Sequence, residues 1–552
     1  MRFATLAPCF ASLASLALLA SACTDDRPTP KLPPELKVIS PMRGTMQEGL
    51  ATVDVTGTVR GNADTQVAVA SVTVNGVAAT VDVDGTFHAQ VPVHAGANMI
   101  KTVAVGVDGA VQSDTRAVVT GDFMPLHSAV DNAISAGLSK AAFTRLGSYA
   151  GDQIAAANLS ALLIPMNPVV AKGLSNGQED CLYGKVNVRN GVDIGDANIQ
   201  FTPTTTGLAM DVSLDRVVAP LHARYAAACL DGDTDLTIRA TQVRIKGNLA
   251  VTVSGGRVHV ALVAPQITLT GFDMQASGLP GAVLDLLDLD QEIGNIMAKA
   301  TEKFVGPMVE QAIEGVKVGE QHVTVLGKDL AINMAAASVH FDPSGADVVL
   351  DTSLIVGSAP ASTSFVYTDD QQPPTRRNTG VELALADDAI NQVMAGFWAA
   401  GALDQTISKD LGLADSIALD ATLPPVVSAG ADGALHLTVG DLIATLSSAG
   451  TPITTMAINV EIALKAEPSP LDPTIVKLSL GLPTITTDIL ADSTGLDREG
   501  LEGLLPTMVQ LQLDGFAPIL GSIPLPAIAG LRPVDVRIGG ASGYITVAAG
   551  IQ

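Results

Sequence analysis

The sequence predicts an α+β protein of two similar modules, each a curved antiparallel sheet wrapped on long amphipathic helices, preceded by an all-β sandwich. Three observations lead to this fold class. Short alternating stretches separated by turn dipeptides occupy residues 36–121. After residue 122, stretches with apolar residues at every third or fourth position alternate with strand patterns. The order of helix, strands and helix then occurs again in the second half of the chain.

The first folded unit, residues 36–121, has the pattern of successive β-hairpins. Asn75-Gly76, Asp84-Gly85 and Asp108-Gly109 are dipeptides that favour tight hairpin turns. Apolar and polar residues alternate in the runs between these turns, which predicts a β-sandwich. The unit resembles the bacterial Ig-like modules that accompany exported enzymes and surface proteins. Such modules are spacers or docking units, so the resemblance implies no catalytic role.

The first module, residues 122–318, is expected to contain two long helices with strands between them. Residues 127–157 carry apolar side chains at intervals of about four, including Ile134 and Leu138, which predicts the first helix. Residues 281–316 repeat this pattern and predict the second helix. Its apolar face carries Ile293, Met297, Phe304 and Met308.

The second module, residues 319–552, contains the least polar helix pattern in the chain. Residues 387–403 begin with two aspartates, which favour a helix start, and no further charged residue occurs before Asp404. Ile390, Met394, Phe397 and Trp398 share one face of this helix. Because its other face is mostly Ala and Gly, protein or another apolar substance must cover it all round. Residues 501–520, which include Met508, predict the last helix.

The N-terminus has the pattern of a bacterial export signal. Residues 1–22 combine a basic Arg2 with a long uncharged, leucine-rich run that ends in small residues. The sequence Ala20-Ser21-Ala22-Cys23 resembles a lipobox, in which Cys23 carries the lipid anchor. Residues 23–35 would then form a proline-rich tether. Thr24 after the cysteine resembles the pattern of outer-membrane sorting, periplasmic or surface-facing. The alternative is an ordinary signal peptide with an incidental cysteine.

Two cysteines remain beyond the signal and the anchor. The chain has four Cys, of which Cys9 lies in the signal and Cys23 at the predicted anchor. An exported chain favours a disulfide between the remaining Cys181 and Cys229 over two free thiols. The sequence has neither a CxxC motif nor a Cys/His cluster, so it gives no indication of a zinc site.

The composition excludes several classes of partner. The formal net charge of −25 disfavours binding to nucleic acid and to anionic lipid surfaces. The chain is 47% hydrophobic, yet aromatic residues make up only 3%. It therefore has few side chains on which bases or sugars could stack. This aliphatic content is sufficient for large cores in two or three domains.

Residues 122–552 resemble the TULIP superfamily, the family of bactericidal/permeability-increasing and lipid-transfer proteins. The first half is expected to open with a helix, as in that family, and the order and lengths of the elements match. Cys181 and Cys229 lie where the first barrel of that family holds its disulfide. ALADDAINQVMAGFWAAGALDQ is similar to the family's acidic-start, uncharged helix. GFAPILGSIPLPAIAGLRPVDVRIGGASGYITVAAG is similar to its final helix, proline-flanked strand and closing hairpin. The resemblance implies two barrels, each holding a lipid between its sheet and its helices.

The resemblance implies that apolar helix residues line two lipid grooves, although each of them also fits plain core packing. The candidate lining residues are Ile134, Leu138, Ile293, Met297, Phe304, Met308, Ile390, Met394, Phe397 and Met508. Methionine is well suited to this role because its unbranched thioether adapts to chains of different length. The chain lacks the basic tip of family members that capture lipopolysaccharide, so the expected ligand is a lipid or lipophilic small molecule that is not strongly anionic.

Catalytic and metal-binding motifs are weak, and we expect neither an enzyme nor a cofactor. The G-x-S-x-G match around Ser175 lacks the strand and helix that a nucleophile elbow needs. Asp231, Asp233 and Asp235 lack the other ligands of an EF-hand and fit an acidic surface loop better than a calcium site. The remaining alternative is a non-catalytic surface scaffold or adhesion protein that docks to protein or glycan through its Ig-like module.

Overall fold

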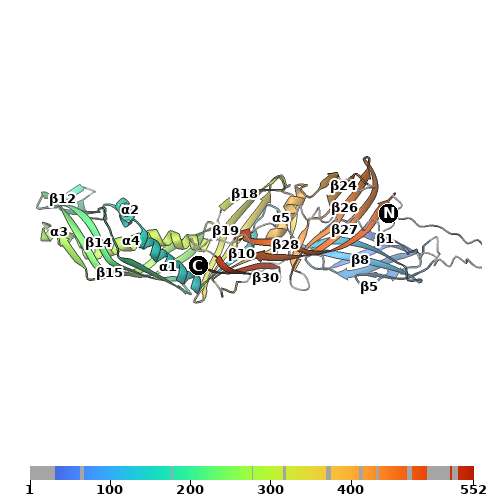
Figure 1. The fold of residues 1–552 in the computed structure, drawn as a ribbon, viewed down its shortest axis with the longest axis horizontal. Helices are drawn as coiled ribbons and strands as arrows, with labels where there is room; N and C mark the ends of the chain where they lie inside the picture. The colour runs from blue at the N-terminus through green and yellow to red at the C-terminus, as the bar shows by residue number, and fades with distance from the viewer. Residues whose placement is uncertain are drawn as a thin grey trace, which may run out of the picture.

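The protein is an elongated, mostly β molecule made of a sandwich, two modules and a sheet between them (Figure 1). The computed structural model describes residues 32–62, 67–175, 178–276, 278–314, 319–368, 375–378, 380–408, 414–429, 434–468, 475–493, 523–524, 533–541 and 543–551. The first module lies at one end, and the second module lies with the sandwich at the other.

The N-terminal sandwich consists of two sheets packed face to face. Its strands are β1 (Glu35–Ser40), β2 (Thr45–Glu48), β3 (Thr52–Arg60), β4 (Val69–Val74), β5 (Val77–Ala78), β6 (Thr80–Val81), β7 (Thr86–Pro92), β8 (Gly96–Gly106) and β9 (Val111–Pro125). One sheet has the order β1-β3-β7-β6 and the other β2-β9-β8-β4-β5. Alternating side chains fill the core, with Val55, Phe87 and Val91 fully buried.

The first module is a long curved sheet with helices along its inner side. Its strands are β11 (Val170–Ser175), β12 (Gln178–Val188), β13 (Asp196–Thr204), β14 (Gly207–Ala227), β15 (Leu230–Ser254), β16 (Arg257–Thr270) and β17 (Asp273–Ala276). Its helices are α1 (Lys140–Ala156), α2 (Leu159–Leu163), the 3-10 turn η1 (Ile164–Met166), α3 (Gly281–Leu287) and α4 (Leu289–Glu314). The sheet has the order β11-β12-β14-β15-β16, so β16 has no strand partner on its outer edge.

The second module has the same plan around α5 (Asp387–Ala399). Its strands are β23 (Gln405–Ser408), β24 (Ser416–Ala421), β25 (Val426–Ala429), β26 (Leu435–Ser448), β27 (Thr451–Pro468), β28 (Ile475–Asp492) and β29 (Ile523–Pro524). The sheet runs β23-β24-β26-β27-β28-β29 with β25 on β26, just as β13 pairs with β14 in the first module. The first six strands of the two modules therefore share one connectivity, although the sequences show no short repeat. The last strands differ, since β17 pairs with β15 and β29 with β28.

A central sheet joins the two modules. Its strands are β18 (Gly319–Val325), β19 (Lys328–Asp342), β20 (Gly345–Val356), β10 (Val130–Ser139), β22 (Val381–Ala386), β31 (Tyr544–Ile551) and β30 (Pro533–Ala541), in that spatial order. β10 leads into α1, β22 leads into α5, and these two strands pair with each other antiparallel. The sheet thus takes strands from both sides of the module boundary predicted at residue 318, and that boundary stays a prediction.

The helix predicted over residues 127–157 is wrong in its first part, because residues 130–139 form β10. That strand is paired on both sides, with β20 and with β22. Ile134 and Leu138 are four residues apart, a spacing that one face of a helix and one face of a strand both satisfy, since four is a multiple of two. Helix α1 begins only after Ser139, whose side chain accepts a hydrogen bond from the Ala142 amide.

The other two predicted helices within the described residues are present with altered limits. The stretch predicted over 281–316 is divided into α3 and α4 at Asp288, whose φ of 43° ends the first helix. The stretch predicted over 387–403 forms a helix that ends at Ala399. The helix predicted over 501–520 lies outside the described residues. None of the helices in the described part of the chain is long and apolar enough to span a membrane.

Candidate functional site

The sheet of the first module changes its inward-facing residues halfway along its length. In β14 every second residue up to Leu214 is buried, and the buried set then resumes at Val217. In β15 the buried set changes phase between Ala240 and Val243. Arg216, between the two sets in β14, is exposed and has a φ of 53°. The sheet bends at this point. In β14 the residues that face inward have even numbers before the bend and odd numbers from Val217 to Ala223.

A wholly apolar cavity of about 50 Å³ lies at this turn. It is bounded by α2 and the start of the sheet on one side, by β14 and β15 below, and by α4 above. The lining residues are Leu163, Val169, Val170, Val186, Val188, Val217, Ala219, Leu221, Ile238, Ala240, Val243, Leu269, Phe272, Leu289, Ile296 and Met297. No polar side chain is among them, so the cavity has nothing to hold a water molecule in place.

The cavity lies between two separate hydrophobic cores. One contains Val217, Ala240 and Val243 and extends toward the central sheet. The other contains Leu221 and Ile238 and fills the outer end of the module. Because the strands change phase between these cores, their side chains do not meet, and small residues such as Ala219 and Ala240 leave the gap unfilled.

Helix α4 covers the cavity and also closes the free edge of the sheet. It lies along β16, with Gly294 against Ile267 and Gly306 against the carbonyl oxygen of Val260. A Cβ at either position would make an ordinary van der Waals contact with the strand, so the helix lies directly against β16. A carboxylate of Glu310 accepts a hydrogen bond of 2.8 Å from the Val260 amide, which has no strand partner on that side.

Only a few polar contacts hold α4 on the sheet within the described residues. Besides Glu310, Glu292 forms a 2.6 Å ion pair with Lys172 of β11. The hydrogen bond from Lys172 to Glu292 raises the pKa of the lysine. Both residues are partly exposed to solvent, which makes this pair a weak restraint. The boundary between α4 and β16 therefore lacks the continuous main-chain hydrogen bonds that join the strands. It is held mainly by apolar packing, in which Val305 and Val309 of α4 are fully buried.

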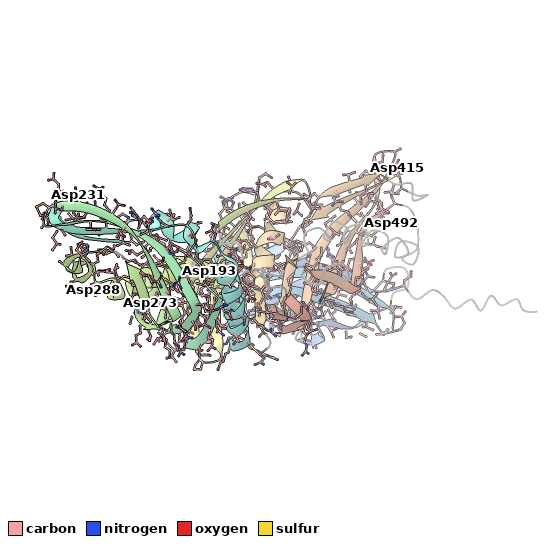
Figure 2. The ribbon with its side chains drawn as sticks, turned by 60° about the vertical axis from the view of Figure 1, so that its left-hand side comes forward. Asp193, Asp231, Asp273, Asp288, Asp415 and Asp492 are labelled. Carbon is pink, nitrogen blue, oxygen red and sulfur yellow. A yellow bond between two sulfur atoms is a disulfide. The ribbon has the colours of Figure 1, made fainter. Side chains whose placement is uncertain are left out.

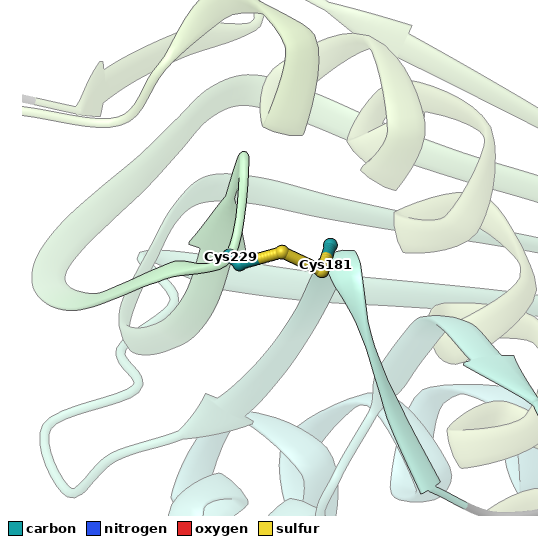
Figure 3. Close-up of a disulfide and its surroundings, with 2 residues drawn as sticks. All are labelled: Cys181 and Cys229. Atoms are coloured by element: carbon teal, nitrogen blue, oxygen red, sulfur yellow. A yellow bond between two sulfur atoms is a disulfide. The ribbon is translucent and has the colours of Figure 1, made fainter.

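The predicted disulfide between Cys181 and Cys229 is confirmed (Figure 3). It links β12 to the turn between β14 and β15 at the outer end of the first module, beyond the cavity. The Cys229 amide also donates a hydrogen bond of 2.9 Å to the carbonyl oxygen of Cys181. The end of the sheet next to the cavity is thereby held closed.

Removing this disulfide should destabilise the protein measurably. Cys181→Ser with Cys229→Ser opens a covalent loop with a sequence separation of 48 residues. Freeing that loop in the unfolded state should lower the free energy of unfolding by about 2–4 kcal/mol. Urea denaturation followed by circular dichroism measures the change. Wild-type protein in reductant should lose a similar amount, and a loss below about 1 kcal/mol would contradict the expectation.

The structure places the predicted lining residues of the first module in different surroundings. Met297 lines the cavity. Phe304 and Met308, further along α4, are partly buried against the inner core. Leu138 belongs to that same core, but it reaches it from β10 and not from a helix. The side chain of Ile293 lies outside the described residues.

The predicted lining residues of the second module lie in a sealed core as far as the structure describes it. Met394 and Phe397 are 0% exposed, and Ile390 packs with them. Met508 lies outside the described residues, as does the predicted lipid anchor Cys23.

The apolar sequence of α5 requires that the helix be covered all round, and protein provides this cover: every residue from Asp387 to Phe397 is buried. Gln392 donates to the carbonyl oxygens of Leu126 and Ser128. Asn391 exchanges two hydrogen bonds with the backbone of Val427. The polar residues of this helix are thus buried and paired with neighbouring segments, so no guest molecule is required to cover them.

The lining residues predicted from the sequence all lie in expected helices, whereas most residues of the cavity wall belong to the sheet. Val217, Ala219 and Leu221 alternate along β14, and Ile238 and Ala240 alternate along β15. A period of two in these runs was the available signal. At Arg216 the buried positions of β14 shift by one residue, and this shift creates the gap. The residue types in the strands do not indicate it.

The weak catalytic and metal motifs lie in ordinary surface structure. Ser175 ends β11 in a hairpin with β12 and donates to Asp180, so the strand–helix turn of a nucleophile elbow is not present at this serine. Asp235 pairs with Arg189 and His222. Among the residues that the structure describes, no group of three or more His, Cys, Asp or Glu side chains could hold a metal ion.

Acidic side chains are spread over the whole length of the molecule (Figure 2). Asp231 and Asp288 lie at the outer end of the first module. Asp415 and Asp492 lie at the far end of the second module.

Comparisons with known proteins give one family match and several distant structural similarities. A family model described as glucodextranase, domain B, matches residues 34–122. No curated protein matches the chain. The crystal structure of lipopolysaccharide binding protein aligns with a TM-score of 0.41 and 14% identity, over 77% of this chain and 99% of that one. P47 of Clostridium botulinum E1 aligns with a TM-score of 0.28 and 10% identity, over 77% of this chain and 100% of that one.

Proposed function

We propose that the first module binds a lipophilic molecule with an unbranched hydrocarbon chain in the cavity beneath α4. The observation that carries this proposal is the lining, in which every residue is apolar although the molecule as a whole is strongly acidic. A cavity without polar partners discriminates against water and polar metabolites and favours hydrocarbon.

The volume of the cavity means that α4 must move to admit a long chain. About 50 Å³ is less than the roughly 150 Å³ of an engineered apolar cavity that binds benzene. Each methylene group buried contributes about 0.8 kcal/mol, so a chain of several carbons can offset the cost of separating α4 from β16. Met297 and Ile296 would then pack against the guest, and the flexible thioether of Met297 suits guests of different shape.

The proposed setting is the bacterial envelope, with the protein anchored to the outer membrane through an acylated Cys23. The lipobox-like sequence and the tether motivate this part of the proposal. The net charge of −25 favours a neutral or zwitterionic headgroup over an anionic one such as that of lipopolysaccharide.

Organic extraction of detergent-free, full-length protein followed by mass spectrometry tests the proposal. Lipid recovered in stoichiometric amounts supports it, and so does saturable uptake of a fluorescent fatty acid by protein that was extracted empty. A protein that is empty and takes up neither a fatty acid nor a phosphatidylethanolamine probe would overturn it. That outcome favours the alternative, a surface scaffold, for which the sealed core around α5 is the specific observation.

Filling the cavity should separate ligand binding from folding. Ala240→Leu places three more carbon atoms in the gap and should lower fatty-acid affinity about tenfold, equivalent to about 1.4 kcal/mol, while the fold is retained. Titration with the fluorescent fatty acid measures the affinity, and thermal unfolding checks the fold. Ala261→Leu, on the exposed side of β16, is the matched control and should bind like wild type. Equal affinity of both variants would remove the cavity as the site.

A further inference from the structure

The N-terminal sandwich is packed firmly against the outer face of the sheet of the second module. Strand β21 (Ser364–Tyr367) extends the sandwich by pairing antiparallel with the end of β9. Ala117 and Val119 of β9 form a buried cluster with Leu423 and Val426 of the second module. Asn459 of β27 is buried at this contact and donates a hydrogen bond of 3.1 Å to the carbonyl oxygen of Thr115.

A group of five charged residues lies in this interface. Arg43 of the sandwich forms ion pairs with Asp441 of β26 at 2.6 Å and with Asp488 of β28 at 3.1 Å. Asp114 contacts Arg43 at 3.4 Å and Arg116 at 2.9 Å. Three carboxylates therefore face two guanidinium groups, so the group carries one excess negative charge when all are ionised. Further along β26 and β27, His436 and Glu461 pair with each other at 3.2 Å.

The two carboxylates of the second module differ in how their oxygens are used. Both oxygens of Asp441 accept hydrogen bonds, Oδ1 from Arg43 and Oδ2 from the amides of Gly44 and Ala117. In Asp488, the contacts with Arg43 and the Thr115 amide both fall on Oδ2. Oδ1 of Asp488 can therefore take a proton while Oδ2 continues to accept both hydrogen bonds. A proton on either oxygen of Asp441 would instead compete with a hydrogen bond that this oxygen already accepts.

We propose that the interface between the sandwich and the second module is a proton-coupled joint, in which docking is tightest when Oδ1 of Asp488 is protonated. Proton uptake removes the excess negative charge of the five-residue group without loss of a hydrogen bond. Asp488 is 8% exposed, so its charge is largely removed from water while the joint is closed. In the open joint the same carboxyl would be hydrated.

The direction of the pH dependence follows from burial. Burial raises the pKa of Asp488; the Thr115 amide and Arg43 lower it in part, and Asp114 raises it again. Burial likewise raises the pKa of Asp441. Asp488 therefore keeps its proton to a higher pH in the closed joint than in the open joint, where its pKa is the ordinary value of ~3.9. The added stability of the closed joint is fully present below the ordinary value and is lost as the pH rises through the raised pKa.

Hydrogen–deuterium exchange of the full-length protein tests the joint. The readout is the protection of peptides from β9, corrected for the intrinsic exchange rate, from about pH 4 to about pH 8. Wild-type protection should fall as the pH rises, by up to about tenfold for each unit that separates the closed and open pKa values. Asp488→Asn copies the protonated carboxyl and should give protection that is high at neutral pH and independent of pH.

Asp441→Asn is the matched variant. It also removes one negative charge, but both oxygens of Asp441 accept hydrogen bonds, so replacing one of them with an amide nitrogen loses an acceptor. It should lower β9 protection at every pH. The proposal is overturned if wild-type protection does not depend on pH, or if Asp488→Asn retains the wild-type dependence. It is also overturned if Asp488→Asn loses as much protection as Asp441→Asn, since the ionised carboxylate would then be what holds the joint.

Discussion

A disulfide that joins α4 to β16 will abolish the uptake of a fluorescent fatty acid by the first module. In Gly294→Cys with Ile267→Cys, the two Cβ atoms lie in place for a bond, since a Cβ on Gly294 would be 3.6 Å from that of Ile267. Protein disulfides have Cβ separations of about 3.5–4.5 Å. The crosslink fixes the helix to the strand edge beside the cavity, and a guest larger than the cavity can no longer enter.

Fluorescence titration of the oxidised and reduced forms of this double variant measures the effect. Reduction should restore uptake to the level of wild-type protein treated with the same reductant, which controls for the loss of the bond between Cys181 and Cys229. The single variants Gly294→Cys and Ile267→Cys should bind in both states. Undiminished uptake by the oxidised double variant would show that α4 does not need to move.

Arg43→Ala should produce the largest loss of stability of any single change in the interface between the sandwich and the second module. The substitution leaves the fully buried carboxylate of Asp441 and that of Asp488 without their guanidinium partner. Removal of one partner from a buried ion pair costs about 3–5 kcal/mol. Urea denaturation at neutral pH measures the free energy of unfolding.

Arg189→Ala is the control for this measurement. Arg189 and its partner Asp235 are 51% and 63% exposed, so water replaces the lost contact and the change should be within about 1 kcal/mol. If Arg43→Ala and Arg189→Ala cost the same, the buried charges of the interface are not held by Arg43.

Local sequence patterns predicted several elements of the structure well. The acidic start and uncharged body of residues 387–403 indicated a helix, and α5 begins at the expected Asp387. Counting the cysteines indicated the pair that forms the disulfide. These features depend on neighbours in the sequence or on residue counts, which the chain shows directly.

The prediction failed where one pattern fits two structures. Ile134 and Leu138 fit a helix and a strand equally, and pairing with β20 and β22 on both sides selected the strand. The sequence predicts lining residues on helices alone, whereas sheet residues such as Ala219 and Ala240 form most of the cavity wall. The change of phase at Arg216 depends on how two long strands twist together.

The amino-acid sequence shows which stretches of this protein are apolar and that its net charge is negative. What covers the apolar stretches depends on tertiary packing: protein surrounds α5, an apolar gap lies beneath α4, and the N-terminal sandwich lies over the second module. Arg43 and Asp441 are 398 residues apart in the chain and 2.6 Å apart in space. Periodicity reports which face of an element is buried, but the partner of that face is chosen by packing between distant segments.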